Sequence, residues 1–262
     1  MANWILVPYP SAAILAYTAS ANNEAADHPA TNVGLVRYPA RTWEATTAVD
    51  FAVNLDLDLG SAQLITDIVL THTNFGAVSI YVGDDGVSFP TLVVADVIHQ
   101  NYEADDRRQA WLTLATPPTK RYVRIQPWSA DAGVTGFAAG NVFVLQSPTP
   151  LAYNPGWPVW TPVQPVGVVP FDGDAREVQA RGPVYLETRL RFANNRGVDD
   201  AHLAEVVRAL RRQTDPFLLY RNNRSVADVN SSQVYFVEPL GPPTVAERFG
   251  TFQLEVVVRE VF

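Results

Sequence analysis

The sequence predicts a mainly β protein with two parts, an N-terminal jelly-roll β-sandwich and a C-terminal α+β domain with one helix. Three observations predict this architecture: short alternating segments with regular turns in the first half, a proline-rich stretch after residue 146, and one amphipathic helical pattern near residue 205. The chain has 262 residues, a length that favours two domains over one.

The first half shows the two-residue period of half-buried β-strands. The clearest strand pattern covers residues 51–59, whose apolar positions are Phe51, Val53, Leu55, Leu57 and Leu59. Further strands are expected at residues 65–73, 78–82, 111–114, 121–125 and 142–145. Asp84-Asp85-Gly86 predicts a hairpin turn, because Asp-Gly pairs tolerate positive φ. Many short strands joined by turns are typical of a sandwich or jelly roll.

Residues 147–170 are predicted to form a strap between the two domains. This segment holds seven of the 20 prolines together with Trp157 and Trp160. Proline has no backbone N–H, so we expect the strap to run extended and outside any sheet. The two tryptophans indicate that it packs against the domains. The predicted boundaries are therefore 1–146 for the sandwich, 147–170 for the strap and 171–262 for the second domain.

The second domain combines strands with one helix. Residues 184–192 alternate, with Val184, Leu186, Leu190 and Phe192 inward and Glu187, Arg189 and Arg191 outward. The helix is expected to begin at Asp199 or Asp200 and to end before Pro216. Its apolar stripe comprises Leu203, Val206, Val207 and Leu210. Strands are expected at residues 217–220, 234–237 and 252–258.

Composition excludes several classes of protein. The absence of cysteine excludes disulfides, thiolate zinc sites and a cysteine nucleophile. The net charge of −8 argues against nucleic-acid binding. No apolar run has the roughly 20 residues of a membrane helix, so no membrane insertion is expected. A secretory signal is not expected either, because Pro8 and Pro10 interrupt the N-terminal apolar run and no basic residue precedes Arg37.

No catalytic or metal motif emerges, so we predict no cofactor, no metal and no enzyme activity. Asp56-x-Asp58-x-Gly60 resembles the start of a calcium loop, but these aspartates also form the polar face of the predicted strand. The four histidines lack zinc-binding spacing, and His72 and His202 are expected to be structural. The sequence has no Gly-x-Ser-x-Gly elbow and no phosphate-binding loop. A glycosidase pair of distant carboxylates remains a third-ranked hypothesis.

The first half resembles the discoidin (coagulation-factor C-type) family. Five short motifs carry the resemblance, and they occur in the same order as in the family. They are Arg41-Thr42-Trp43, Asp58-Leu59-Gly60, Ile65-Thr66-Asp67-Ile68, Asp85-Gly86-Val87-Ser88-Phe89 and Lys120-Arg121-Tyr122-Val123-Arg124-Ile125. The resemblance spans residues 20–146 and implies a galactose-binding-like jelly roll that binds sugars, lipids or proteins through loops at one end. Those loops would be 21–42, 74–77 and 100–108. The calcium pattern of some members is not recognisable.

Aromatic and planar polar side chains in these loops are the candidate ligand-binding residues, because sugars offer apolar ring faces and fixed hydroxyl groups. They are Tyr38, Asn74, Tyr102 and Arg107. The competing hypothesis is that these side chains contact a neighbouring subunit, where Tyr and Arg are also favoured.

The second half resembles the tail-tube-type domains of bacteriophage baseplate and distal tail proteins. The resembling parts are the 184–192 strand, the helix, the 217–220 strand followed by Asn222 and Asn223, and the closing 252–262 segment. The resemblance implies a ring around the tail axis, often hexameric. The leading prediction is a non-enzymatic virion tail component, assembled in the bacterial cytoplasm, which contacts tail tube, hub and fibre proteins and a host surface glycan. The alternative is a carbohydrate-binding accessory module.

Overall fold

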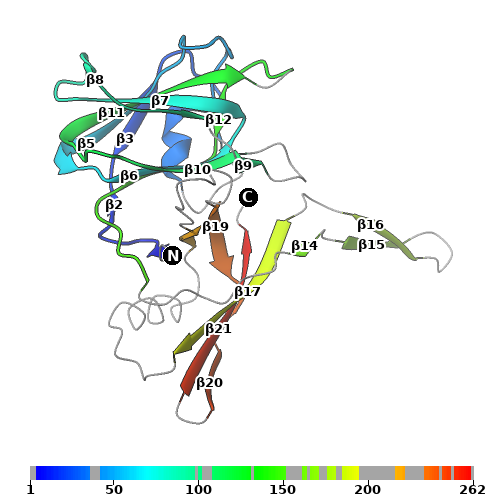
Figure 1. Ribbon diagram of the computed structural model, residues 1–262. Coiled ribbons are helices and arrows are strands. Elements are labelled where there is room, and N and C mark those ends of the chain that lie inside the picture. Colours follow the sequence, from blue (N-terminus) through cyan, green and yellow to red (C-terminus); the bar gives the residue numbers. More distant parts are fainter. Residues whose placement is uncertain are drawn as a thin grey trace.

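A computed structural model shows a chain built of antiparallel β-sheets in three layers (Figure 1). The structure describes residues 4–35, 42–97, 100–101, 108–130, 133–151, 161–163, 166–170, 176–180, 185–194, 216–221, 233–241, 244–248 and 251–260. The first two layers form a sandwich, and the third is a sheet made mainly of C-terminal strands. The mainly β class and the jelly-roll sandwich predicted from the sequence are confirmed.

The first layer, called here the outer sheet, has the strand order β3-β5-β11-β7-β8. Its strands are β3 (Thr18–Ala21), β5 (Leu55–Leu64), β11 (Thr119–Ala130), β7 (Phe75–Gly83) and β8 (Thr91–Val97). The Asp85-Gly86 turn joins β7 to β8 as predicted. Gly86 has a φ of +71°, and one oxygen of the Asp85 carboxylate accepts hydrogen bonds from the backbone N–H groups of Val87 and Ser88.

The second layer, called the inner sheet, has the order β2-β13-β6-β10-β9. Its strands are β2 (Ile14–Leu15), β13 (Val142–Leu145), β6 (Asp67–Thr73), β10 (Arg108–Thr113) and β9 (Gln100–Asn101). A short 3-10 helix, η1 (Ala30–Gly34), and a two-stranded ribbon of β4 (Trp43–Glu44) and β12 (Ala138–Ala139) close one end of the sandwich.

The sandwich core fills the space between the outer and inner sheets. Leu55, Leu57, Val123 and Ile125 are buried there, as the predicted alternation requires, and Trp43 is fully buried among them. Phe51 does not follow the predicted pattern. It has a φ of +62°, precedes β5, and exposes 53% of its surface. The buried alternation predicted for 51–59 therefore begins at Val53 instead.

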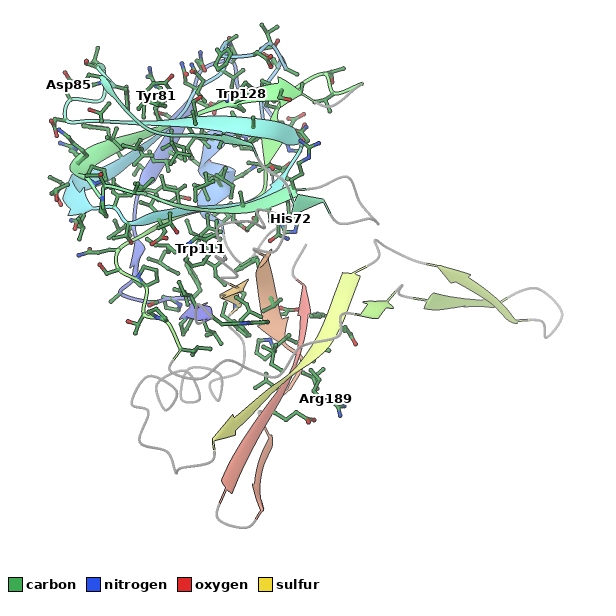
Figure 2. All side chains as sticks on the ribbon, in the orientation of Figure 1. His72, Tyr81, Asp85, Trp111, Trp128 and Arg189 are labelled. Atoms are coloured by element: carbon green, nitrogen blue, oxygen red, sulfur yellow. The ribbon has the colours of Figure 1, made fainter. Side chains whose placement is uncertain are left out.

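The third layer has the strand order β1-β18-β19-β21-β17-β14, with β20 paired to β21. Its strands are β1 (Ile5–Pro8), β18 (Phe217–Arg221), β19 (Gln233–Pro239), β21 (Thr251–Glu260), β17 (Tyr185–Asn194), β14 (Thr161–Val163) and β20 (Thr244–Arg248). In β17, Leu190 is buried, as the predicted inward position requires. Arg189 is exposed, as the predicted outward position requires (Figure 2). Arg189 pairs with Glu255 of β21 at 3.1 Å.

The inner sheet is buried on both of its faces. Every residue of β6 is buried, because Ile68 and Leu70 face the sandwich core whereas Val69 faces the third layer. Phe143 of β13 meets Phe236 of β19 across this second interface, with ring centroids 5.3 Å apart. The buried Asp67 carboxylate accepts hydrogen bonds from Trp111 Nε1 at 2.8 Å and Thr113 Oγ1 at 2.6 Å. The sandwich and the C-terminal sheet therefore pack as continuous layers.

The first strand of the chain lies in the third layer. β1 pairs with β18 from Ile5–Tyr220 to Pro8–Phe217. Its side chains alternate between two buried clusters, with Ile5 and Val7 toward the inner sheet and Trp4 and Leu6 on the opposite side. The stretch before β2 thus belongs to the C-terminal sheet rather than to the sandwich.

The proline-rich strap contains strand structure, contrary to the expectation that it avoids every sheet. Pro162 lies in β14, and Pro170 ends β15 (Val166–Pro170), which pairs with β16 (Arg176–Ala180). β14 is an edge strand and β15–β16 is a two-stranded ribbon, so proline is accommodated where a strand has a neighbour on one side only. Trp157 and Trp160 lie outside the described residues.

The predicted α+β character of the second domain has no support in the described residues, which are strands and short connections there. The predicted helix near residues 199–212 lies outside them. Within the described ranges, no helix is long and apolar enough to cross a membrane.

Candidate functional site

One end of the sandwich carries Asn74 and the described parts of the predicted 21–42 loop. The register pairs Ala21 with Leu55, Ala130 with Phe75, and Ala77 with Val97. The described connections that leave the outer sheet at this end therefore include residues 22–35, 42–54 and Asn74. We call this the loop end.

An aromatic pair lies at the loop end, on the outer face of the outer sheet, and consists of the exposed Phe51 and the half-buried Trp128. The rings of Phe51 and Trp128 stack with centroids 5.8 Å apart and planes inclined by 24°. Trp128 lies near the end of β11 and, like Arg124 and Gln126, points away from the core, because Val123 and Ile125 occupy the inward positions of the same strand. Figure 2 shows Trp128 on this face. The neighbouring Val49 is 62% exposed and extends the apolar surface.

Side-chain amides of Asn22, which follows β3, and of Gln126 in β11 hold the loop that carries Phe51. Asn22 donates to Ala52 O at 3.0 Å and accepts from Asn54 N at 2.5 Å. Gln126 Nε2 donates to Phe51 O at 3.1 Å and to Asn54 Oδ1 at 2.9 Å. On the other side, Asp50 accepts from Ser129 N at 2.8 Å. The loop is thus fixed before any ligand arrives.

Phe51 has an unusual backbone for an exposed aromatic residue. Its φ of +62° lies in the left-handed region, which costs a non-glycine residue about 1–2 kcal/mol. Such strain persists only where the surroundings enforce it, and it concentrates at functional sites. The amide contacts around residues 50–54 supply this enforcement, and they display the phenyl ring to solvent.

Two arginine–carboxylate pairs lie along the outer sheet, at increasing distance from the aromatic pair. Arg124 binds Asp56 through Nε at 2.7 Å and Nη2 at 2.8 Å. Arg121 binds Asp58 through the same two atoms, each at 2.8 Å. The two aspartates of the calcium-like motif are therefore neutralised by guanidinium groups. Among the described residues, no group of three or more His, Asp or Glu side chains could hold a metal ion.

The Arg121 pair gives a pH-dependent contribution to stability. Hydrogen bonds from Arg121 are the largest cause that lowers the pKa of Asp58 from 3.8 to about 2. Because the folded-state pKa lies below the unfolded-state value, this stabilisation is complete above about pH 4 and is lost as the pH falls toward about 2. We expect Asp58→Asn to be less stable than the wild type at neutral pH and to lose less stability between these two pH values. Urea unfolding midpoints measured across the acidic range test this, and identical acid profiles would contradict it.

Of the predicted ligand-binding residues, only Asn74 lies in the described part. Its Oδ1 accepts from Ala138 N at 2.7 Å and its Nδ2 donates to Gly136 O at 2.9 Å, so its amide fixes the 136–138 backbone. Tyr38, Tyr102 and Arg107 lie outside the described residues. Their role in binding stays a prediction. His72 lies in β6 and is buried, as expected of a structural residue.

Sequence reasoning missed the aromatic pair. Phe51 was assigned to the core, and Trp128 was not singled out. A signal for Trp128 was present: it shares its strand parity with Tyr122, Arg124 and Gln126, which are polar or amphipathic positions on the face opposite Val123 and Ile125. An indole in such a row is expected to be solvent-facing.

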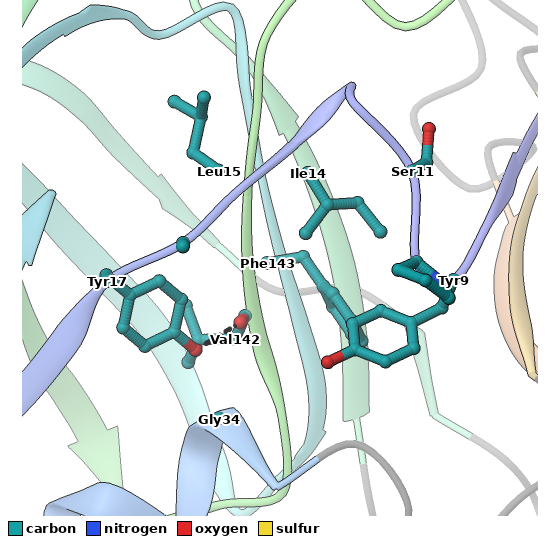
Figure 3. A pocket seen from close by; sticks show the side chains of 10 residues that line it. Tyr9, Ser11, Ile14, Leu15, Tyr17, Gly34, Val142 and Phe143 are labelled. Atoms are coloured by element: carbon teal, nitrogen blue, oxygen red, sulfur yellow. Dashed lines mark hydrogen bonds between the residues drawn. The ribbon is translucent and has the colours of Figure 1, made fainter.

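A separate cavity of about 290 Å³ lies where β1 leaves the third layer (Figure 3). It is lined by Tyr9, Pro10, Ser11, Ile14, Leu15, Ala16, Tyr17, Gly34, Val142 and Phe143. The Tyr17 hydroxyl donates to Val142 O at 2.5 Å and also lies 3.2 Å from Val33 O. Burial raises the pKa of Tyr17, so this hydroxyl stays protonated and acts as a structural donor. The lining is mainly apolar and offers few directional groups to a ligand.

Solved structures similar to this chain include carbohydrate-binding modules. The family 32 module of NanJ from C. perfringens, in complex with galactose, is 19% identical, with a TM-score of 0.42, and the match covers 55% of this chain and 99% of that one. A module from Clostridium perfringens in complex with GalNAc-β-1,3-galactose is 15% identical, with a TM-score of 0.41 over 51% and 99% of the two chains. The AlyQ module, in complex with 4,5-unsaturated mannuronic acid, is 20% identical, with a TM-score of 0.40 over 51% and 96%.

No family model matches the sequence, and no curated protein matches it. The comparisons give no support to the phage tail interpretation.

Proposed function

We propose that this protein is a non-catalytic carbohydrate-binding module, and that it holds its ligand on the Phe51–Trp128 pair. The observation that supports this is the stack of the exposed Phe51, on a loop fixed by amide side chains, against the half-buried Trp128 of β11. Pyranose rings have apolar faces that stack on aromatic rings, and a rigid platform reduces the entropy lost on binding.

Planar polar groups surround the aromatic pair at the loop end. Asn22 and Asn23 are exposed, and Gln126 lies beside Trp128 on the same strand. Their amides are oriented by contacts to the backbone of the Phe51 loop, including Asn23 Nδ2 to Ala52 O at 3.3 Å. Fixed amides discriminate among hydroxyl arrangements, because a misplaced hydroxyl leaves a polar group without a partner.

Phe51→Asn separates binding from folding. Asparagine tolerates left-handed φ better than phenylalanine, so the variant should unfold at the wild-type temperature or above it. Loss of the ring should weaken glycan binding at least about tenfold, equivalent to about 1.4 kcal/mol. A glycan array identifies the sugar, and calorimetry then compares wild type, Phe51→Asn and the conservative Phe51→Tyr.

The matched control is Val87→Ala, which removes an 84% exposed apolar side chain at the opposite end of the sandwich. It should bind like the wild type. If no glycan binds, or if Phe51→Asn binds as tightly as the wild type, the proposed function is wrong.

The predicted ring-forming tail component is the second candidate. It draws support from the edges of the third layer, where β14 pairs only with β17 and β20 only with β21 among the described strands. Free edges are templates for pairing between subunits. This function requires a ring-sized oligomer in the absence of any glycan, whereas a binding module has no such requirement, so light scattering distinguishes the two.

A further inference from the structure

We infer that the ligand is a neutral, linear glycan that lies along β11, from the Phe51–Trp128 pair toward Tyr81 and Phe89. This inference rests on the proposed function and names the class of its ligand. It concerns the solvent face of the outer sheet, beyond the loop end.

The solvent face of β11 is long enough to hold several sugar rings in a row, and we call this face the track. Its outward side chains occur at every second residue and are Tyr122, Arg124, Gln126 and Trp128. At about 3.3 Å per residue, Trp128 and Tyr122 lie roughly 20 Å apart. A single sugar would occupy one end of this track, whereas a chain of several pyranose rings would run along it.

Aromatic rings also occur at the far part of the track. Tyr81 of β7 is directly opposite Arg124 in the register, and it projects from the same face as Trp128 (Figure 2). The Arg124 guanidinium lies 4.0 Å from the centre of the Phe89 ring. Arg121 lies 4.8 Å from the centre of the Tyr122 ring. Apolar surfaces thus flank the strand at two positions separated by the amide of Gln126.

The charges along the track are matched within the protein. Arg124 pairs with Asp56, Arg121 pairs with Asp58, and Lys120 Nζ lies 2.6 Å from Asp84 Oδ2. An acidic polysaccharide would have to compete with these carboxylates for the cations. A neutral chain only exchanges hydrogen bonds with water and covers the rings, so charge complementarity favours a neutral occupant.

A length series tests the inference. The probes are neutral linear oligosaccharides (cello-, manno-, xylo- and galacto-oligosaccharides) from disaccharide to hexasaccharide, with alginate oligomers as acidic counterparts. We expect affinity for the preferred neutral series to rise at least tenfold with length. Phe51→Asn should weaken binding of every length, whereas Tyr81→Ala should weaken only the longer chains, by about fivefold or more.

Tyr81→Thr introduces a β-branched residue, which favours strands, and serves if the alanine variant is unstable. Leu240→Ala, which removes a 43% exposed apolar side chain of the third layer, should leave the whole series unchanged. Binding that depends on Phe51 but not on length or on Tyr81 would overturn the inference and leave the proposed function intact. Tighter binding of alginate than of every neutral series would overturn the neutral class. Absence of binding to all of these probes would overturn the inference, whereas absence of binding across the glycan array would overturn the proposed function.

Discussion

Trp43→Ala is expected to lower the free energy of unfolding by about 3–5 kcal/mol, the usual cost of removing a buried large aromatic side chain. Trp43 is fully buried in the sandwich core, between the loop end and the core strands. Its replacement leaves a cavity beside β4 and β12, which pair with each other there. Chemical denaturation of the full chain measures the loss.

Trp43→Phe provides the control. The Trp43 Nε1 atom is buried and has no hydrogen-bond partner in the described part of the chain, so phenylalanine removes an unsatisfied donor together with part of the ring. We expect this variant to lose less than half as much stability as the alanine variant. A near-zero loss for Trp43→Ala with the fold intact would place the indole outside the core.

The contact between Phe143 and Phe236 is expected to couple the sandwich to the third layer. Both rings are buried, and each single replacement by alanine should cost about 3–4 kcal/mol. In the double variant the losses should fall short of additivity by about 0.5–1.5 kcal/mol, because the aromatic contact is lost only once. A double-mutant cycle on unfolding free energies tests this.

The same cycle shows whether the sandwich and the third layer unfold together or separately. If the two layers unfold together, both variants should shift a single transition. Strict additivity, or a Phe236→Ala variant that leaves the stability of the sandwich unchanged, would contradict the packing of Phe143 on Phe236.

Local periodicity was sufficient to predict most of the sandwich. Residues 121–125 and 65–73 were placed correctly because one or both faces of these strands are buried, and burial selects the residue type at each position. The turn at Asp85-Gly86 was equally predictable, since its chemistry is local. The buried faces of the inner sheet are visible in the continuous apolar run Ile68-Val69-Leu70.

Two features could not be read from local patterns. Strand pairing between β1 and β18 depends on residues at opposite parts of the chain, and no local pattern identifies the partner of a strand. The candidate site depends on the positive φ angle of one residue, Phe51. Phe51 continues an apolar alternation in sequence, but it has a positive φ and is exposed. Tertiary hydrogen bonds donated by Asn22 and Gln126 and accepted by Asp50 hold that conformation.

The placement of β1 has a consequence for biosynthesis. β1 leaves the ribosome well before its partner strand β18, because the strands of the sandwich lie between them in the sequence. The sandwich strands from β3 to β13 can pair in the meantime, leaving Trp4, Ile5, Leu6 and Val7 without their final cover. Closure over such a large sequence separation is slow, and exposed apolar strands invite aggregation during the delay. Chaperone dependence during translation should therefore be greater for this chain than for a sandwich whose strands all pair with near neighbours.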